Sequence, residues 1–171
     1  MAASARPSRQ PRAARELGYI KPQLCELVKA PPSGDGWVHE AKLDGYRTQL
    51  HVRKGKPVLF SRNGLDWTHR FPEIAKASER LDPCVIDGEV CAVDGEGLPS
   101  FAGLTDALTA KSTGGLVFYV FDMMFGNGGN LMSYPLLTRK KVLKSALGKL
   151  KGADRKRFSV VDHHKGDAAA M

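Results

Sequence analysis

The sequence feature that most constrains the fold is a run of alternating residues at 46–53, followed closely by a second short apolar run. Alternate positions from Tyr46 to Val52 are apolar or small, and polar residues lie between them, which predicts a half-buried strand of period two. Residues 55–57, Gly-Lys-Pro, are a turn signal before the apolar run 58–61. Strands joined by so short a turn run antiparallel, so we expect a β-hairpin here.

The remaining elements follow without a regular alternation of strands and helices. The pattern predicts a short strand over 37–42, a helix opened by Pro72 and running to Arg80, strands over 84–86 and 90–93, a helix capped by Ser100, a buried strand over 116–124, and a helix over 138–150. The last helix would turn Leu143 and Leu147 inward. Hairpins followed by helices in this order predict an α+β fold built on antiparallel sheets.

Composition limits the class of protein. The 171 residues fit one domain, and 42% hydrophobic with 26% charged residues excludes wholesale disorder. No apolar stretch is long enough for a transmembrane helix. The net charge of +8 favours a polyanionic partner. Three cysteines without a CxxC pair indicate reduced thiols in a cytosolic protein and give no sign of a structural zinc site.

The N-terminal residues differ in composition from the rest. Residues 1–17 are rich in Ala, Arg, Ser and Pro, and Pro7 and Pro11 would spoil the amphipathic helix of a transit peptide. We therefore expect a flexible basic lead over 1–17 and a folded domain over 18–171.

The segment Glu40-Ala-Lys42-Leu-Asp44-Gly45-Tyr-Arg47 carries the most chemical information. A lysine amine is a good nucleophile only when neutral, and its free pKa of about 10.4 keeps it protonated at neutral pH. Burial near a strand end, beside other cations, would lower that pKa. The Asp-Gly turn would bring lysine and arginine around one phosphorylated ligand. Taken alone, Lys-x-Asp-Gly is more typical of an ordinary hairpin with a surface lysine.

Several further blocks change that interpretation. They are Ser61-Arg62-Asn63-Gly64 with Asp66-Trp67-Thr68 and Arg70-Phe71-Pro72, Asp87-Gly88-Glu89-Val90, Pro99-Ser100-Phe101, Phe118-Tyr119-Val120-Phe121-Asp122, and Pro135-Leu136-Leu137 with Arg139-Lys140-Lys141. In this order, from about Ile20 to the C-terminus, the chain resembles the covalent nucleotidyltransferases: ATP-dependent DNA ligases, RNA ligases and capping enzymes. It is similar in particular to the ligase domain of bacterial ligase D, an end-joining enzyme.

The resemblance implies a role for each candidate residue. Lys42 would attack the α-phosphate of ATP and hold AMP, Glu40 would accept a hydrogen bond from the adenine amino group, Arg47 and Arg62 would contact ribose and phosphates, Glu89 would bind the ribose hydroxyls or a Mg²⁺ or Mn²⁺ ion, and Phe121 would stack on adenine. Simpler roles remain open: a solvated turn residue for Arg62 and a core residue for Phe121. Whether Asp87 or Glu89 faces the nucleotide is also open, since period two puts both on one face.

The chain departs from the family pattern towards its end. The strand with a metal-binding glutamate and the final Lys-x-Lys strand have no counterpart, nor has the oligonucleotide-binding domain. Residues 158–162 look like the strand before the first of these, and 166–171 like the start of a helix. Ala102 stands where the family commonly has glutamine. We therefore expect a partial adenylation domain, ATP-grasp-like and incomplete at the C-terminus, that as an isolated chain is poorly active or inactive as a ligase, so that it does not seal nicks robustly.

Two other functions compete with ATP-dependent sealing of DNA breaks. One is an RNA ligase or capping-type nucleotidyltransferase. The other is a non-catalytic DNA-binding remnant, which would use basic residues between 139 and 157, among them Arg139, Lys140 and Lys144, although a solvated face is the usual reason for such a run. The resemblance implies nicked or broken DNA as substrate, Ku and end-joining polymerase modules as partners, and a bacterial cytoplasmic location.

Overall fold

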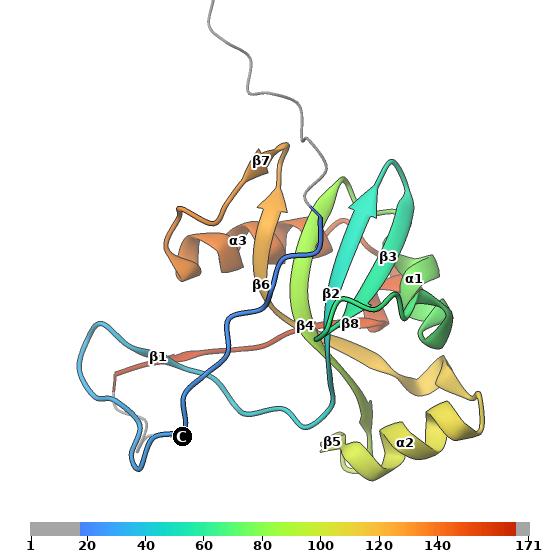
Figure 1. Ribbon diagram of the computed structural model, residues 1–171, viewed down its shortest axis with the longest axis horizontal. Helices are drawn as coiled ribbons and strands as arrows, with labels where there is room; N and C mark the ends of the chain where they lie inside the picture. Colours follow the sequence, from blue (N-terminus) through green and yellow to red (C-terminus); the bar gives the residue numbers. More distant parts are fainter. Residues whose placement is uncertain (1–17, 167–171) are drawn as a thin grey trace, which may run out of the picture.

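The computed structural model describes residues 18–166, in which a central sheet is built mainly from antiparallel strands (Figure 1). The strand order is β3-β2-β4-β6-β7, with β5 paired to β4 and β8 paired parallel to β6. The strands are β2 (Tyr46–Arg53), β3 (Lys56–Ser61), β4 (Cys84–Val93), β5 (Pro99–Ser100), β6 (Val117–Gly126), β7 (Gly129–Asn130) and β8 (Phe158–Val160). The predicted hairpin and the antiparallel α+β class are confirmed, with β8 as a parallel exception.

Four α-helices and two single 3₁₀ turns connect the strands in the described part of the chain. They are α1 (Pro72–Ser78), α2 (Phe101–Thr109), α3 (Leu136–Leu147), α4 (Gly152–Lys156), and the turns Thr68–Arg70 and Thr113–Gly115. The predicted cap of α2 is confirmed, because the Ser100 hydroxyl accepts a hydrogen bond of 3.1 Å from the Gly103 N–H. The predicted flexible lead over 1–17, and residues 167–171 of the predicted final helix, lie outside the described residues.

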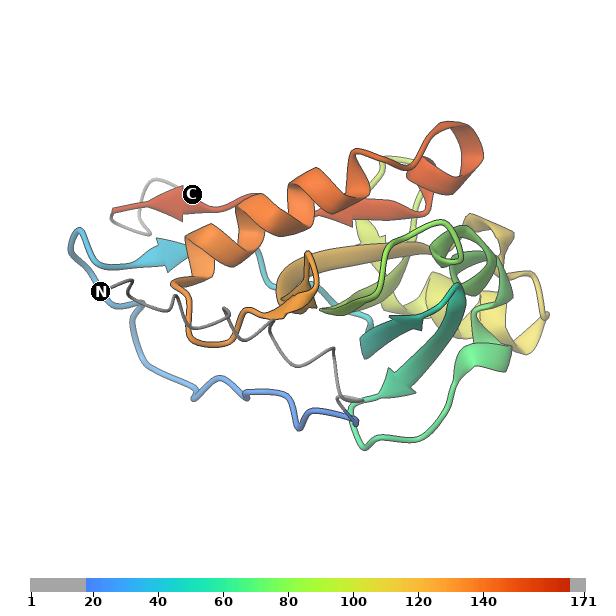
Figure 2. The ribbon, with the colours of Figure 1, turned by 90° about the horizontal axis from the view of Figure 1, so that it is seen from above.

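The main core lies between one face of the sheet and the helices α1 and α3. Leu50, Ile86 and Phe118 from the sheet and Leu143 and Leu147 from α3 are all completely buried, so the predicted inward face of the last helix is confirmed. Figure 2 shows α3 on one side of the sheet and the N-terminal segment, drawn in blue, on the other.

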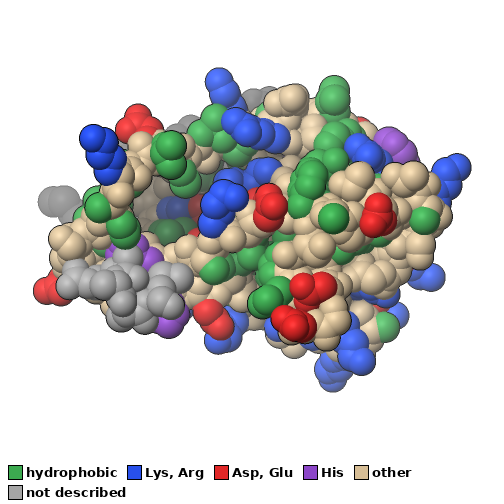
Figure 3. All heavy atoms as spheres, turned by 90° about the horizontal axis from the view of Figure 1, so that it is seen from below, with side chains coloured by type: hydrophobic (Ala, Val, Ile, Leu, Met, Phe, Trp, Pro, Cys, Tyr) green, Lys and Arg blue, Asp and Glu red, His purple; other side chains and the backbone are tan. Residues whose placement is uncertain are grey.

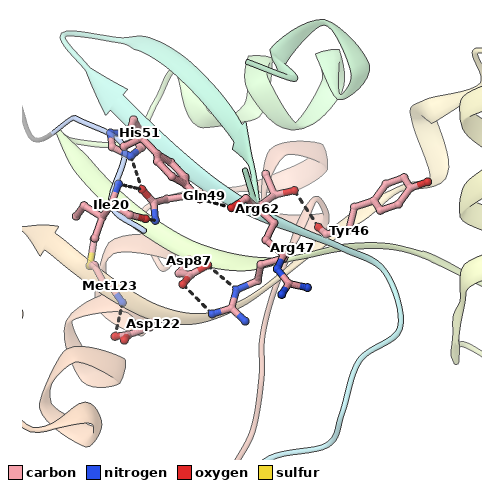
Figure 4. Close-up of polar contacts among 11 residues, drawn as sticks. Ile20, Tyr46, Arg47, Gln49, His51, Arg62, Asp87, Asp122 and Met123 are labelled. Carbon is pink, nitrogen blue, oxygen red and sulfur yellow. Dashed lines mark hydrogen bonds and ion pairs between the residues drawn. The ribbon is translucent and has the colours of Figure 1, made fainter. Parts of the chain in front are cut away.

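Both faces of β2 are buried, which corrects the prediction of a half-buried strand. Gln49 and His51 are only 3% and 2% exposed. The N-terminal segment covers them: Ile20 donates to Gln49 Oε1 and accepts from Gln49 Nε2, each at 2.9 Å, and Gln49 Oε1 also lies 2.8 Å from the His51 ring (Figure 4). Tyr19 packs against Phe60 beside them. A polar side chain can be buried here because its hydrogen bonds are made inside the protein.

The strands expected on either side of Asp87-Gly88-Glu89 form one continuous strand, β4. Gly88 lies inside this strand because there is no room for a side chain at its position. A Cβ atom at this position would come within 2.4 Å of the Tyr119 carbonyl oxygen and 2.6 Å of the Phe118 ring. The glycine therefore permits close contact between β4 and β6. At one end the same strand buries Cys84, and this burial raises the pKa of the Cys84 thiol to about 12.

A separate two-stranded ribbon leaves the main sheet. Its strands are β1 (Val38–His39) and β9 (His164–Lys165), which pair antiparallel. The strand predicted over 37–42 is therefore shorter than expected. Its partner lies at the far end of the chain, and the pairing ends at His39.

Replacing Gly88 with alanine tests the packing of β4 on β6. We expect Gly88→Ala to lower the free energy of unfolding by about 3 kcal/mol, because the new methyl group meets backbone that cannot easily move. Urea unfolding followed by circular dichroism measures this. Gly95→Ala is the matched control, since a Cβ atom there meets nothing within 4 Å; equal stability of the two variants would contradict the prediction.

Candidate functional site

Lys42 lies in the irregular connection between β1 and β2, and its side chain is exposed. This corrects the expectation that the lysine is buried near a strand end. The reason is that β1 pairs with β9 rather than with the main sheet, so the chain re-enters the sheet only at Tyr46. The position leaves the Lys42 amine open to a ligand approaching from solvent.

Gly45 joins this connection to the sheet. Its N–H donates a hydrogen bond of 2.8 Å to Glu89 Oε1 on β4. A Cβ atom at Gly45 would lie 2.3 Å from the Val90 carbonyl oxygen and 2.7 Å from the Cys91 sulfur. The glycine of the Asp-Gly pair therefore allows the Lys42 segment to approach β4 closely. A larger residue at position 45 would push the segment away from the strand.

Glu89 lies opposite Arg47 in the pairing of β2 with β4. Burial raises the pKa of the Glu89 carboxyl, and the Gly45 N–H and the charges of Arg47 and Lys42 oppose that rise without cancelling it.

Arg47 is held on two sides. Its guanidinium donates two hydrogen bonds, of 2.8 and 2.9 Å, to the two oxygens of Asp87 (Figure 4) and lies 4.5 Å from the centre of the Phe121 ring. Burial alone would lower the pKa of Arg47, but the Asp87 hydrogen bonds and the charges of Asp87 and Glu89 raise it above its usual value. Asp87 thus pairs with Arg47, and Glu89 with Gly45, which separates the roles of the two carboxylates.

Phe121 lies at a β-bulge in the pairing of β6 with β4. Gly88 pairs with Val120 and Asp87 pairs with Asp122, so Phe121 has no direct partner on β4. Alternation along β6 puts Val120 and Phe121 on opposite faces: Val120 is completely buried, whereas Phe121 is only partly buried, with its ring against Arg47. The alternative of a core residue at Phe121 is therefore excluded.

A cavity of about 360 Å³ opens beside these groups. Its lining residues are Leu24, Gly45, Tyr46, Arg47, Ser61, Arg62, Asn63, Leu65, Trp67 and Glu89. It brings together three of the predicted nucleotide contacts, Arg47, Arg62 and Glu89, whereas Lys42, Glu40 and Phe121 are not in its lining. Figure 3 shows the molecule from below, where Lys and Arg side chains gather beside a hollow with acidic side chains near them.

Arg62 is an exposed residue of the turn after β3, and its carbonyl oxygen accepts a hydrogen bond from the Tyr19 hydroxyl. The N-terminal segment thus borders the cavity as well as covering β2. The sequence patterns did not predict that the N-terminal segment borders the cavity. They also did not predict the packing of Tyr46 against Trp67, whose ring centres lie 5.3 Å apart. Contacts between segments so far apart leave no local pattern in the sequence.

The three basic residues predicted to bind DNA are placed differently from one another. Lys140 is 5% exposed, and its Nζ lies 2.5 Å from Glu40 Oε1 and 2.9 Å from the Val161 carbonyl oxygen. Arg139 makes two hydrogen bonds to Asp122, of 2.7 and 2.8 Å. Lys144 is exposed. A solvated face does not describe the whole run, because Lys140 points into the protein; DNA contact at these three residues stays a prediction.

Metal binding at Glu89 also stays a prediction. Within residues 18–166, no group of three or more His, Cys, Asp or Glu side chains is placed to hold a metal ion. A Mg²⁺ ion bound through one or two carboxylates and substrate phosphates needs no such group, so Glu89 still fits this kind of site.

Comparison with known proteins identifies the family. The model of the ATP-dependent DNA ligase domain matches residues 22–169. The chain belongs to this family. Its antiparallel sheet agrees with a solved structure described as mycobacterial DNA ligase D complexed with ATP and MES, with a TM-score of 0.65 and 27% identity over 77% of this chain and 41% of that one.

Two curated relatives are similar to about three quarters of this chain. The multifunctional non-homologous end joining protein LigD of Pseudomonas aeruginosa is 36% identical over 131 residues, which are 75% of this chain and 16% of that protein. The SPbeta prophage-derived DNA ligase-like protein LigB of Bacillus subtilis is 30% identical over 74% of this chain and 47% of its own length. The chain therefore spans less than half of each. None of its described helices is long and apolar enough to cross a membrane.

Replacing Glu89 with glutamine tests the buried carboxyl. Because its pKa in the folded protein is raised above 4.5, the folded protein binds this proton more tightly than the unfolded chain does, and the stability that the protonated carboxyl contributes is lost as pH rises through the raised pKa. Glutamine keeps the acceptor for the Gly45 N–H but cannot ionise. We expect Glu89→Gln to gain stability relative to the wild type as pH rises from about 4.5 to about 7.

Urea unfolding of both proteins across this pH range measures the effect. Asp94→Asn, in the exposed turn after β4, is a control for removing a carboxylate from the protein. A difference between Glu89→Gln and wild type that stays constant with pH would contradict the raised pKa.

Proposed function

We propose that this chain is the adenylating part of an ATP-dependent DNA ligase and that Lys42 forms a covalent lysyl-AMP. In this reaction the Lys42 Nζ attacks the α-phosphorus of ATP. A nitrogen–phosphorus bond forms, the bond to pyrophosphate breaks, and the amine loses a proton. The observation that carries the proposal is the joining of the Lys42 segment, through Gly45, to Glu89 and Arg47 at one cavity.

The cavity suits a nucleotide in size and chemistry. Its volume of about 360 Å³ lies within the range of small-molecule sites. Arg47 and Arg62 offer guanidinium groups for ribose and phosphate oxygens. Glu89 offers a carboxylate for the ribose hydroxyls or for a Mg²⁺ or Mn²⁺ ion, which would offset phosphate charge during transfer.

Phe121 would supply the stacking surface for adenine. Its ring now lies against the Arg47 guanidinium at 4.5 Å. A planar base can replace or join a guanidinium on an aromatic face, because both make favourable contacts with the ring. A base that replaces the guanidinium on the ring would require a shift of Arg47 away from Phe121 towards the phosphates.

The later steps of ligation would transfer AMP to a DNA 5′-phosphate and join that end to a 3′-hydroxyl. The name of the P. aeruginosa relative describes non-homologous end joining, and we propose the same process for this chain, with nicked or broken DNA as substrate in a bacterial cytoplasm. Ku and end-joining polymerase modules are the partners that this process would require.

The competing function, a non-catalytic DNA-binding remnant, has less support. It depends on the basic run from residue 139 to 157, but Arg139, Lys140 and Lys149 in that run are engaged in ion pairs with Asp122, Glu40 and Asp82. These pairs remove part of the free positive charge that would attract a phosphate backbone. A capping-type activity would differ in the choice of GTP, which the following experiment also tests.

Incubation with α-labelled ATP and Mn²⁺, followed by denaturing electrophoresis, tests the proposal. We expect label on the wild type, less than about 1% of that label on Lys42→Ala because the nucleophile is removed, and little label from GTP. Lys56→Ala, which removes an exposed lysine at the β2–β3 turn, should label like the wild type. Failure of folded wild type to take label, or label that persists in Lys42→Ala, would contradict the proposed function.

A further inference from the structure

A buried ion pair links helix α3 to Glu40. Lys140 is 5% exposed, its Nζ lies 2.5 Å from Glu40 Oε1, and it also donates to the Val161 carbonyl oxygen at 2.9 Å. The Glu40 side chain keeps 26% of its surface exposed. One carboxylate oxygen is thus held from the protein side, and the side chain still reaches solvent.

Glu40 depends on such a partner because of its place in the chain. It lies one residue beyond His39, where the pairing of β1 with β9 ends, and the chain has no regular structure again until β2. The backbone therefore does little to fix its side chain. Lys140 lies on α3, which is anchored in the core by the completely buried Leu143 and Leu147, so its Nζ is a fixed point by comparison.

The residue before Lys140 makes a parallel contact. Arg139 binds both oxygens of Asp122, and Asp122 directly follows Phe121 in the bulge of β6. Two successive residues of α3 thus hold the segments that carry the two predicted adenine contacts, Glu40 and Phe121. Helix α3 is therefore in contact with both of these segments through neighbouring side chains.

We propose that Lys140 is a positioning residue for base selection, acting through Glu40; this rests on the proposed function. An ionised carboxylate can only accept hydrogen bonds. With Oε1 held by Lys140, the other oxygen is left to accept from the exocyclic amino group of adenine. Guanine carries a carbonyl oxygen at the corresponding ring position. This oxygen and the carboxylate oxygen are both hydrogen-bond acceptors, so neither would be paired. Such a mismatch is costly in a partly buried site.

The geometry explains why a lysine is needed here. Without its charge, Glu40 would turn towards solvent, where a carboxylate is better hydrated. The preference for adenine over guanine would then fall, whereas the phosphate contacts of Arg47 and Arg62, which lie at the cavity, would remain. Loss of Lys140 should therefore weaken ATP binding while leaving GTP binding almost unchanged.

Calorimetric titration with ATP and GTP tests this on the wild type, Lys140→Met, Lys140→Arg and Lys144→Met. Lys144→Met removes an exposed lysine of the same helix and is the matched control. We expect the ratio of the GTP to the ATP dissociation constant to fall about tenfold in Lys140→Met, to be largely restored in Lys140→Arg, and to be unchanged in Lys144→Met. An unchanged ratio in Lys140→Met, or equal binding of the two nucleotides by the wild type, would overturn the proposal.

A double-mutant cycle keeps the test independent of catalysis and of nucleotide binding. Urea unfolding of Lys140→Met, Glu40→Gln and the double variant should give effects that do not add, because the two side chains contact each other. Additive effects would overturn the proposal whatever the binding data show. Selective ATP binding that depends on Lys140, combined with no transfer of label to the wild type, would support this inference and contradict the proposed lysyl-AMP reaction, so the two failures can be told apart.

Discussion

The register of β2 against β4 is the constraint on which the rest of the site depends. It sets Arg47 opposite Glu89 and Gln49 opposite Asp87, which lets Arg47 bind Asp87 while Glu89 remains free to accept from the Gly45 N–H. A slip of one residue would turn Arg47 to the other face of the sheet, which is the apolar core. The face of β2 opposite the site is buried in the core, which makes such a slip costly. The packing of the core therefore fixes the relative positions of the site residues.

Two further segments, one on each side of the sheet, complete the arrangement. The N-terminal segment covers the site face through the two hydrogen bonds of Ile20 to Gln49 on β2, and it borders the cavity at Leu24. Helix α3 lies on the opposite side and reaches round to Glu40 and Asp122. Each segment is held by hydrogen bonds to buried or partly buried groups, which are expensive to leave unpaired. The parts that would recognise a nucleotide are thus braced by side chains that are not themselves in the cavity.

Much of the fold could be predicted because it depends on local patterns. Alternation gave the hairpin at 46–61, a serine before an apolar face gave the cap of α2, and the apolar run 116–124 gave β6. The burial of Gln49 was missed because the chain that covers it lies 29 residues earlier. Local patterns do not encode contacts of that range.

Which residues belong to the site was more predictable from the sequence than how they are arranged. The resemblance selected Arg47, Arg62 and Glu89, which the structure brings to one cavity. It gave no sign that Lys140 is buried against Glu40, because a lysine in a basic run usually faces solvent. Phe121 follows a buried Val120, so alternation along β6 turns its ring to the site face, whereas the bulge in the pairing with β4 left no sign in the sequence.

A crystal structure of the chain with bound ATP would test most directly whether this sheet builds a nucleotide site. We expect the nucleotide in the cavity between Gly45, Arg47 and Glu89, with the base on Phe121 and the α-phosphate nearest to Lys42. Nucleotide bound elsewhere on the molecule, or a cavity that stays empty at saturating ATP, would contradict this arrangement.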